Sequence, residues 1–543
     1  MTREVPLPSG SGSGAGLGTT TARVPFGRPD GGRVAPDDPH AGDPLHDFVY
    51  FDERYSHRGL GMDGSDRSVR VIVGKKGAGK TLYLRRLHAF AVAEPSLYAD
   101  DIQQTYPKTD EVVKVSNWYH GSIVVEKWMA IWKAAILRSV VSHLLCGRRL
   151  VYDGPDYESA LRSDYTRLYP EFREPHSIYS QVREIINHRS HTSPDRLDRY
   201  LADAQWEELE YRLGQILLRC PPMCFYIDAI DEEFRHAPMY WLMCQKGLFY
   251  QVLRLLSDAR IGGRLHITIC VRDIVYSSTQ ATEHGTRYAE TQYIHTLDWD
   301  REAIRHFLHE KLARLPRPQP ANVADWLGTA EVRNGRRPRG VEDVEAYLLR
   351  HTRLIPRDII VLGNMLCIEI AQRKSRLTDA EIRAVVRRAA RKFGDEQIAA
   401  CANHIASDLM PRQAAELGYA DIYTGQDADG FEGGDAYQKG LADDLRGMLA
   451  TLRTDRFGRG KFEQFAEIAT EHFSGKADPI SALWQNGLIG YIDGRVADGP
   501  VVFYAAGHED GLRLPTGKRG YALHPIVVDC IDPLRGHGTP VVA

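Results

Sequence analysis

The pattern of apolar and polar positions divides the chain into regions of different character. Between residues 46 and 300, short apolar runs alternate with segments whose apolar residues recur at helical spacing, such as Val124 to Leu137 and residues 206–219. The apolar runs are 69–73 (VRVIV), 111–116 (EVVKVS), 223–228 (MCFYID) and 265–271 (LHITICV). This alternation predicts an α/β fold, in which a parallel sheet is covered by helices.

The second half of the chain has a different pattern. Within a second domain at 301–420, the residues up to about 405 are helical in pattern almost throughout, and Asp298 or Asp300 is placed to cap the first of these helices. Glycine and aspartate then interrupt the pattern over 421–436, which predicts a linker. We therefore expect an α-helical lid domain to follow the α/β core.

Residues 437–535 carry a third pattern. Two helical segments, 444–452 and 461–473, precede a shorter one that begins the run 480–492, and apolar runs then flank a glycine-rich loop at 507–520. Three helices closed by a hairpin with a long loop are the plan of a winged helix. We expect a winged-helix domain in this region.

Two segments do not fit these domains. Residues 1–45 are rich in Gly, Ser, Pro and Asp and nearly free of large apolar side chains, which predicts a disordered tail. Residues 147–200 are polar and rich in Tyr, Arg and Ser, and we expect them to form an insertion on the α/β core.

Composition narrows the class of protein. A chain of 543 residues is expected to form roughly three or four domains. The 69 Lys and Arg against 72 Asp and Glu leave a net charge of -3, so no global positive field favours nucleic acid. The eight cysteines lack the paired spacing of a zinc site, which favours reduced thiols. The apolar segments are interrupted by charges, so we expect a soluble, cytoplasmic protein without a membrane contact.

The most specific motif follows the first apolar run. Gly74, Gly79, Lys80 and Thr81 match the pattern G-x-x-x-x-G-K-T, with a predicted strand before it and a helical pattern after it. In such a loop the backbone N–H groups wrap a phosphate, the lysine reaches the terminal phosphates and the threonine hydroxyl binds Mg²⁺. The candidate nucleotide-binding residues are Gly74, Lys75, Lys76, Gly77, Ala78, Gly79, Lys80, Thr81 and Leu82. We therefore expect a nucleotide and Mg²⁺ as ligands.

A carboxylate for the metal is available at the end of the third apolar run. Asp228 ends this run, and Asp231 and Glu232 come just beyond it. Asp228 is predicted to bind the metal together with Thr81, and either Asp231 or Glu232 to orient the attacking water as a base. Acidic residues after a strand are also common in solvated loops and helix caps.

Two arginines are candidates for phosphate contacts. Arg272 follows the fourth apolar run, where it contacts the γ-phosphate or lies on the surface. Arg357, in "IPRD", begins a predicted helix of the lid, from which it would reach the phosphates or pair with an acid such as Asp358.

These features together resemble the signal-transduction (STAND) and origin-recognition branch of the AAA+ P-loop ATPases. The resemblance rests on "GKKGAGKT", on "FYIDAIDEE", on the arginine after the next strand, and on a helical domain followed by a winged helix. It implies ATP or ADP and Mg²⁺ as cofactors. In the signalling members the two C-terminal domains close over ADP, and a winged-helix histidine touches its phosphate. His524 is the implied residue here, with Leu523 and Pro525 in place of the family's Met and Asp.

Three functions fit these observations. The first is a slow Mg²⁺-dependent ATPase that acts as a nucleotide-controlled switch, together with a protein partner or a second copy, in the bacterial signalling or defence setting that the resemblance permits. The second is an ATP-controlled DNA-binding protein, whose DNA contact lies in residues 437–535 and uses Arg513, Lys518 and Arg519. The third is a protein-interaction scaffold in which ATP is structural and residues 152–200 of the insertion are the docking surface.

Overall fold

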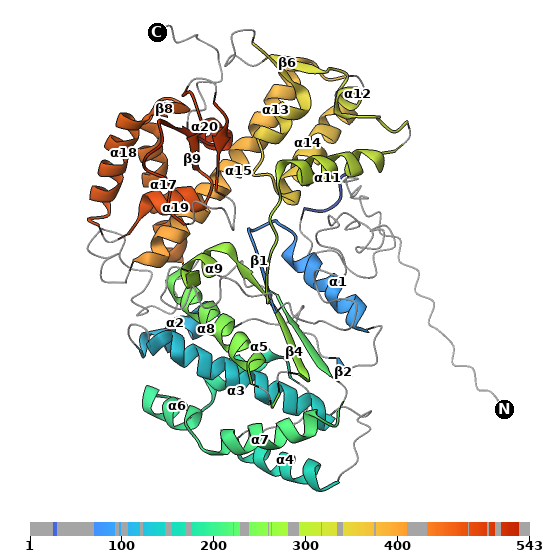
Figure 1. Ribbon diagram of the computed structural model, residues 1–543, viewed down its shortest axis with the longest axis vertical. Coiled ribbons are helices and arrows are strands. Elements are labelled where there is room, and N and C mark those ends of the chain that lie inside the picture. The colour runs from blue at the N-terminus through green and yellow to red at the C-terminus, as the bar shows by residue number, and fades with distance from the viewer. Residues whose placement is uncertain are drawn as a thin grey trace, which may run out of the picture.

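The computed structural model describes most of the chain. The described residues are 25–29, 70–92, 97–98, 107–119, 123–146, 155–168, 176–220, 222–228, 238–258, 260–261, 263–280, 293–316, 318–333, 340–373, 376–409, 432–475, 477–496, 499–504 and 512–531. Figure 1 shows three groups of elements: an α/β part, a helical part that contains α11 to α14, and a C-terminal part that contains α17 to α20.

A five-stranded sheet forms the centre of the α/β part, and all its paired strands are parallel. Its strand order is β2-β3-β4-β1-β5. The strands are β1 (Val71–Gly74), β2 (Leu97–Tyr98), β3 (Met223–Ile227), β4 (Leu265–Arg272) and β5 (Ile294–Thr296). The strands predicted at 69–73, 223–228 and 265–271 are thereby confirmed as β1, β3 and β4, and the prediction of a parallel sheet is confirmed.

Helices cover both faces of this sheet, which explains why its inner strands are apolar without alternation. Ile72, Tyr226 and Cys270 face one side, where they form an apolar cluster with Tyr83 and Leu84 of α1 (Lys80–Val92). The alternate residues of the same strands belong to the main core with α3 (Ile123–Cys146) and α8 (Pro238–Leu256), and α9 (Asp273–Gln280) also packs against β1 and β4. The helix predicted from Val124 to Leu137 lies within α3.

The prediction of a strand at 111–116 is wrong. These residues lie in α2 (Thr109–Asn117), whose Glu111 side chain accepts a hydrogen bond from the Lys108 N–H at 2.8 Å. Val112, Val115 and Ser116 are buried at helical spacing, so the short apolar run fits a helix as well as a strand. The neighbouring strand of the sheet is instead β2, which has only two residues.

The described part of the predicted 147–200 insertion forms helices that pack into the α/β core. They are α4 (Pro155–Leu168), α5 (Ile178–Asn187) and α6 (Pro194–Leu201), and α7 (Gln205–Leu217) follows them, confirming the helix predicted at 206–219. Helix α5 packs directly on α3 and buries Tyr179 and Val182. This segment was expected to be a polar insertion, but the inward face of α5 is part of the core.

The helical part begins where the sequence predicted a cap. Asp300 accepts a hydrogen bond from the Ala303 N–H at 2.7 Å and so caps α11 (Arg301–Ala313). The next elements are α12 (Val323–Leu327), β6 (Glu331–Arg333), β7 (Val341–Asp343), α13 (Val344–Arg350), α14 (Pro356–Arg373) and α15 (Asp379–Asp408). The pattern did not indicate the β6–β7 hairpin, whose strands have three residues each.

The C-terminal part combines helices with a four-stranded antiparallel sheet of order β10-β9-β11-β8. Its elements are α17 (Glu432–Ala450), β8 (Arg456–Gly458), α18 (Arg459–His472), α19 (Pro479–Gln485), β9 (Ile489–Ile492), β10 (Val501–Val502), β11 (Gly520–Leu523) and α20 (Pro525–Ile531). Residues 432–436 of the predicted linker belong to α17, and residues 421–431 lie outside the described residues.

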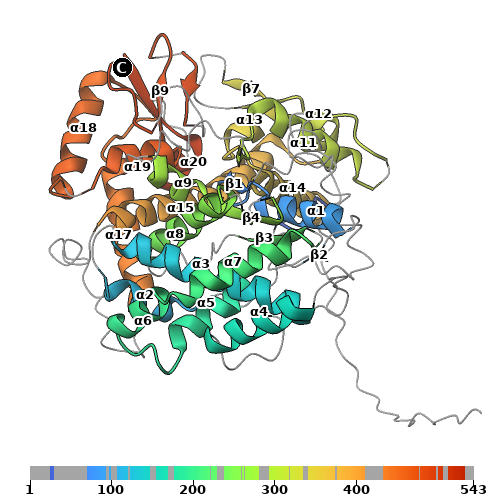
Figure 2. The same ribbon diagram turned by 60° about the horizontal axis from the view of Figure 1, so that its bottom comes forward.

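Helix α15 connects these parts in space. It packs against α8 of the α/β part, α14 of the helical part, and α17, α19 and α20 of the C-terminal part. Figure 2, turned from the first view, again shows α15 between α8 and the C-terminal elements. Among the helices that the structure describes, none is long and apolar enough to cross a membrane.

A short piece of the predicted disordered tail is docked on the helical part. Phe26 is completely buried, and its ring lies 5.3 Å from that of Trp326 in α12. Asn364 of α14 accepts a hydrogen bond from the Phe26 N–H at 2.9 Å and donates one to the Gly27 carbonyl at 2.8 Å. The prediction of disorder is therefore wrong for residues 25–29.

Candidate functional site

The glycine-rich motif forms a tight loop between β1 and α1, and we call residues 74–81 the candidate phosphate loop. Gly77 and Gly79 have φ values of +91° and +99°, a region that other residues rarely adopt. The Ala78 N–H donates to the Lys75 carbonyl at 3.1 Å, and the Tyr83 N–H donates to the Gly79 carbonyl at 3.0 Å as α1 begins. The loop thus leads from a buried strand into the N-terminus of a helix, where backbone N–H groups favour an anion.

Lys80 is folded back into the loop. Its side chain is buried, and Nζ donates to the carbonyl oxygens of Gly74 at 2.9 Å and Lys75 at 3.2 Å. By contrast, the neighbouring Lys76 is exposed, while Lys75 and Leu82 are half-buried. Lys80 therefore places a positive charge inside the loop, and Lys76 faces solvent.

Thr81 and Asp228 meet at the end of the sheet. The Thr81 hydroxyl donates to Asp228 Oδ2 at 2.7 Å, although the two residues come from different strand–helix connections. Asp228 is 8% exposed. A hydroxyl and a carboxylate are the oxygen ligands that a small hard cation such as Mg²⁺ prefers. In the described ranges no cluster of three or more His, Cys, Asp or Glu is placed to hold a metal ion, so these two oxygens would need ligands from a bound molecule or water.

Arg272 ends β4 beside the loop, whereas Asp231 and Glu232 lie outside the described residues. The Cα of Arg272 pairs with that of Gly74 in the sheet register. The Arg272 side chain is 7% exposed, so it is buried and does not lie on the open surface. Its charge, together with burial, contributes to a lowered pKa of about 4 for His404 in α15. Arg272 therefore lies where the sheet end meets α15.

The start of α14 lies over the candidate phosphate loop. A Cβ atom added at Gly77 would lie 2.9 Å from Arg357 Cβ and 3.1 Å from Ile355 Cδ1. The Arg357 N–H donates to the Gly77 carbonyl at 3.4 Å, and Arg357 Nε donates to the Pro29 carbonyl at 3.2 Å. The aliphatic part of Arg357 thus covers the loop, while its guanidinium contacts the docked N-terminal segment.

Asp358 has a different arginine partner from the one that the sequence suggested. Arg353 donates to both carboxylate oxygens of Asp358, at 2.6 and 2.9 Å, and also to Glu396 at 2.9 Å. Asp358 is completely buried, and its charge helps to raise the pKa of Arg353. This ion pair fixes the turn before α14, in which Leu354 has a φ of +54°, and so fixes the position of Arg357.

The C-terminal part also reaches the loop, through Tyr504. Lys75 Nζ lies 6.0 Å from the centre of the Tyr504 ring, a cation–π contact at the limit of range. Burial raises the pKa of Tyr504 to about 12, and a hydrogen bond with Ser277 of α9 partly opposes this effect. Tyr504 therefore contacts both the candidate phosphate loop and the helix that follows Arg272.

His524, predicted to touch a phosphate, lies on the same side of the molecule as Lys75. Burial lowers its pKa to about 3, and the charges of Lys75, Arg353 and Arg350 lower it further. Its Nδ1 accepts a hydrogen bond from the Ile526 N–H at 3.3 Å, so the proton of the neutral ring is on Nε2. The ring is thus a neutral donor among three cations.

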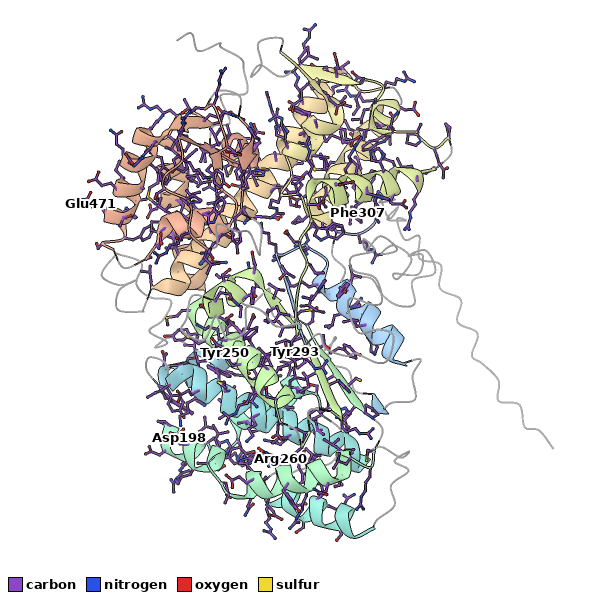
Figure 3. All side chains as sticks on the ribbon, viewed as in Figure 1. Asp198, Tyr250, Arg260, Tyr293, Phe307 and Glu471 are labelled. Carbon is purple, nitrogen blue, oxygen red and sulfur yellow. The ribbon has the colours of Figure 1, made fainter. Side chains whose placement is uncertain are left out.

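Two of the three cations proposed for DNA contact are exposed. Arg513 and Arg519 are exposed, whereas Lys518 Nζ lies 4.2 Å from the centre of the Tyr491 ring. Helix α19, the third helix of the region, packs against α15, and the following residue Asn486 accepts a hydrogen bond from Gln397 at 2.8 Å through its carbonyl. Figure 3 shows Glu471 of α18 at the outer edge, away from α15.

Several contacts of the site could not be expected from the sequence. Trp299 Nε1 donates to the Ala78 carbonyl at 3.0 Å, and the Tyr179 hydroxyl donates to the Asp228 carbonyl at 2.7 Å. The contact of Lys75 with Tyr504 and that of Arg357 with Pro29 were likewise not expected from the sequence. None of these residues belongs to a motif, and an isolated aromatic residue gives no signal of this kind.

The chain was compared with known protein families and with curated protein sequences. No family model matches the chain, and no curated protein sequence matches it.

Proposed function

We propose that the protein binds ATP with Mg²⁺ at the candidate phosphate loop and acts as a slow ATPase of the P-loop type, in which the bound nucleotide controls the arrangement of the parts around it. Under this proposal the helical part is the lid, and the C-terminal part is a winged helix. The STAND and origin-recognition resemblance is part of the proposal.

One observation carries the proposal. The loop that matches a phosphate-binding motif contacts the start of α14 through Arg357 and the C-terminal part through Tyr504, and Arg357 in turn contacts Pro29. A loop that served only to join β1 to α1 would not require these contacts. A triphosphate bound there would lie beside both the helical part and the C-terminal part. A change in its charge would therefore act on both parts.

The residues have distinct roles under this proposal. Lys80 exchanges its contacts with the Gly74 and Lys75 carbonyls for phosphate oxygens, and Thr81 and Asp228 hold the cation between them. Arg272 and the Nε2–H of His524 are the candidates for contact with the terminal phosphates. The catalytic base is Asp231 or Glu232.

The present arrangement does not favour the DNA-binding alternative. In winged-helix proteins of the helix-turn-helix type, the last of the three helices reads the major groove. Here that helix is α19, with Ala482, Leu483 and Trp484 buried, and α15 packs against it. Helix α15 therefore occupies one side of this helix, and that side is not open to DNA.

The test compares two lysines of one loop. ATP affinity and steady-state hydrolysis are measured for the wild type, Lys80→Ala and Lys76→Ala, each with Mg²⁺ and with EDTA. Because hydrogen bonds to charged groups contribute about 1.5–3 kcal/mol, Lys80→Ala should weaken ATP binding about 10- to 100-fold. Lys76 would contribute its backbone N–H to the phosphates, and Lys76→Ala keeps that group. The variant removes the same charge from an exposed position and should change affinity less than about threefold.

The outcomes separate the candidate functions. Equal affinities for the two variants would show that the loop does not hold the phosphates. Turnover that rises on addition of duplex DNA, and is lost in Lys80→Ala, would favour the DNA-binding alternative. Tight binding with no turnover under any condition would favour the scaffold.

A further inference from the structure

Tyr179 connects the helices below the sheet to the candidate metal site. Its hydroxyl donates a hydrogen bond of 2.7 Å to the backbone carbonyl of Asp228, and the side chain is 1% exposed. The carboxylate of the same Asp228 accepts the hydrogen bond from Thr81. A residue of α5 therefore contacts the backbone of the residue whose carboxylate we propose to bind Mg²⁺.

Asp228 follows directly on the paired part of β3. The paired register of β3 and β4 ends at Ile227 and Ile269, so Asp228 lies one residue beyond the last pair. A hydrogen bond from a buried hydroxyl fixes the plane of that peptide, and with it the direction of the Asp228 side chain.

Tyr179 is itself held rigidly. Its ring meets Trp132 of α3 edge to face, with ring centres 5.8 Å apart, and Trp132 Nε1 donates to the Cys244 carbonyl at 2.9 Å. The segment just before α5 is tied to α3 as well, because the Ser139 hydroxyl donates to the His176 carbonyl at 2.7 Å. A hydroxyl supported in this way can define the position of its acceptor to within a fraction of an ångström.

We propose that Tyr179 is a positioning residue for the metal site: it orients Asp228 toward Thr81 and so sets the Mg²⁺ requirement of nucleotide binding. The inference rests on the proposed function, because it assumes that ATP and Mg²⁺ bind at this loop. Tyr179 touches neither the nucleotide nor the metal in this account, and it acts only through Asp228.

The experiment uses the full chain and removes one hydroxyl. ATP binding is measured by calorimetry in EDTA and at a series of Mg²⁺ concentrations for the wild type, Tyr179→Phe and Tyr240→Phe. Tyr240 is the matched control, since it is 3% exposed and its hydroxyl donates to Asn117 Oδ1 at 2.5 Å, away from Asp228. Asp228→Asn serves as the reference for a damaged metal site.

In the wild type, ATP affinity should rise with Mg²⁺ concentration and reach half of its full increase at a defined concentration. Tyr179→Phe should raise that concentration about three- to tenfold, the factor expected for one lost hydrogen bond. Its ATP affinity in EDTA should equal that of the wild type. Tyr240→Phe should match the wild type in both measurements. The melting temperature of each variant without ligand measures how far the loss of its hydroxyl destabilises the fold. This loss of stability should be similar for Tyr179→Phe and Tyr240→Phe.

Two results would overturn the inference while leaving the proposed function intact. Either Tyr179→Phe keeps the wild-type Mg²⁺ requirement, or its affinity falls by the same factor with Mg²⁺ and with EDTA, which is the behaviour of a purely structural residue. If the wild type binds no ATP, or if its ATP affinity does not depend on Mg²⁺, the proposed function fails and the inference fails with it.

Discussion

The two sides of the candidate phosphate loop are built in different ways. The inner side depends on residues close in sequence, since Lys80 contacts the carbonyls of Gly74 and Lys75. The outer side is covered by Arg357 and Tyr504, which are hundreds of positions away, and Arg357 in turn contacts Pro29. A motif can encode the first kind of contact, whereas only the folded chain creates the second.

This difference suggests a division of roles. The inner side holds the groups that would bind a phosphate and its metal, and these are the groups that P-loop proteins need for binding alone. The outer side holds the groups through which other parts of the chain would respond to the ligand. Substitutions on the outer side should therefore alter stability and closure more than they alter the contacts to phosphate.

The largest effect on the outer side is expected for Phe26→Ala. Truncation of a fully buried phenylalanine costs about 3–5 kcal/mol, and here it also frees the segment whose Pro29 carbonyl holds Arg357. Chemical denaturation should show the earlier transition in the helical part, and limited proteolysis should cut near residues 25–29 sooner than in the wild type.

Gly363→Ala provides an independent check on the same contact. A Cβ atom at this position of α14 would lie 2.3 Å from Phe26 Cδ1, so alanine should expel the ring and reproduce the Phe26→Ala result. Without that ring, alanine within a helix would stabilise the chain by up to about 1 kcal/mol relative to glycine. A more stable Gly363→Ala variant would show that Phe26 is not docked there.

A smaller effect is expected from pH, through His524. The pKa of this half-buried ring is about 3 in the folded chain, because it is shielded from water and lies near Lys75, Arg353 and Arg350, and about 6.5 when unfolded. The group leaves the free energy of unfolding unchanged above pH 6.5. As the pH falls from 6.5 toward 3, the unfolded chain takes up a proton that the folded ring does not, so stability decreases by about 2 kcal/mol by pH 5.

The measurement is the free energy of unfolding at pH 7.5, 6.5, 5.5 and 5.0 for the wild type and His524→Asn. Below pH 6, the free energy of unfolding of the wild type should fall more steeply with decreasing pH than that of the variant. The difference in slope should be about 1.4 kcal/mol per pH unit. Parallel curves would mean that the ring takes up its proton in the folded state and does not lie among the cations.

The smallest effect is predicted for Gly77, where the inner and outer sides of the candidate phosphate loop meet. Gly77→Ala should cost about 1–2 kcal/mol, because φ is +91° and the new Cβ would meet Arg357. ATP affinity should fall about tenfold, as the inner and outer sides are both disturbed. Gly447→Ala is the control, since nothing lies within 4 Å of a Cβ on that helical residue; it should keep full affinity and gain slightly in stability.

The sequence predicted correctly those elements whose own residues carry a clear pattern. Strands β1, β3 and β4 are apolar runs, and of the two predicted cap residues, Asp298 and Asp300, Asp300 caps α11. The run at 111–116 was misread because five or six residues with valines at positions 112, 113 and 115 fit either period. Strand β2, with two residues, is too short to leave any pattern.

For the candidate site, the sequence indicated which residue types would meet but not what surrounds them. Thr81 and Asp228 were predicted to bind one metal together, and they meet although β4 lies between β1 and β3 in the sheet. The docking of Phe26 depends on the absence of a Cβ at Gly363 and on the amide of Asn364, more than 300 residues later. Tyr179 lay in a segment expected to be a surface insertion, so its contact with Asp228 was not foreseen.

The central claim is that a nucleotide at the candidate phosphate loop controls the packing of the C-terminal part. Hydrogen exchange of peptides covering 499–504 and 520–528 tests it directly, measured without nucleotide, with ADP, and with Mg²⁺ and a non-hydrolysable ATP analogue. We predict that protection of these peptides differs between ADP and the ATP analogue in the wild type, and not in Lys80→Ala. The same exchange in all three states, with nucleotide binding verified by calorimetry, would contradict the account.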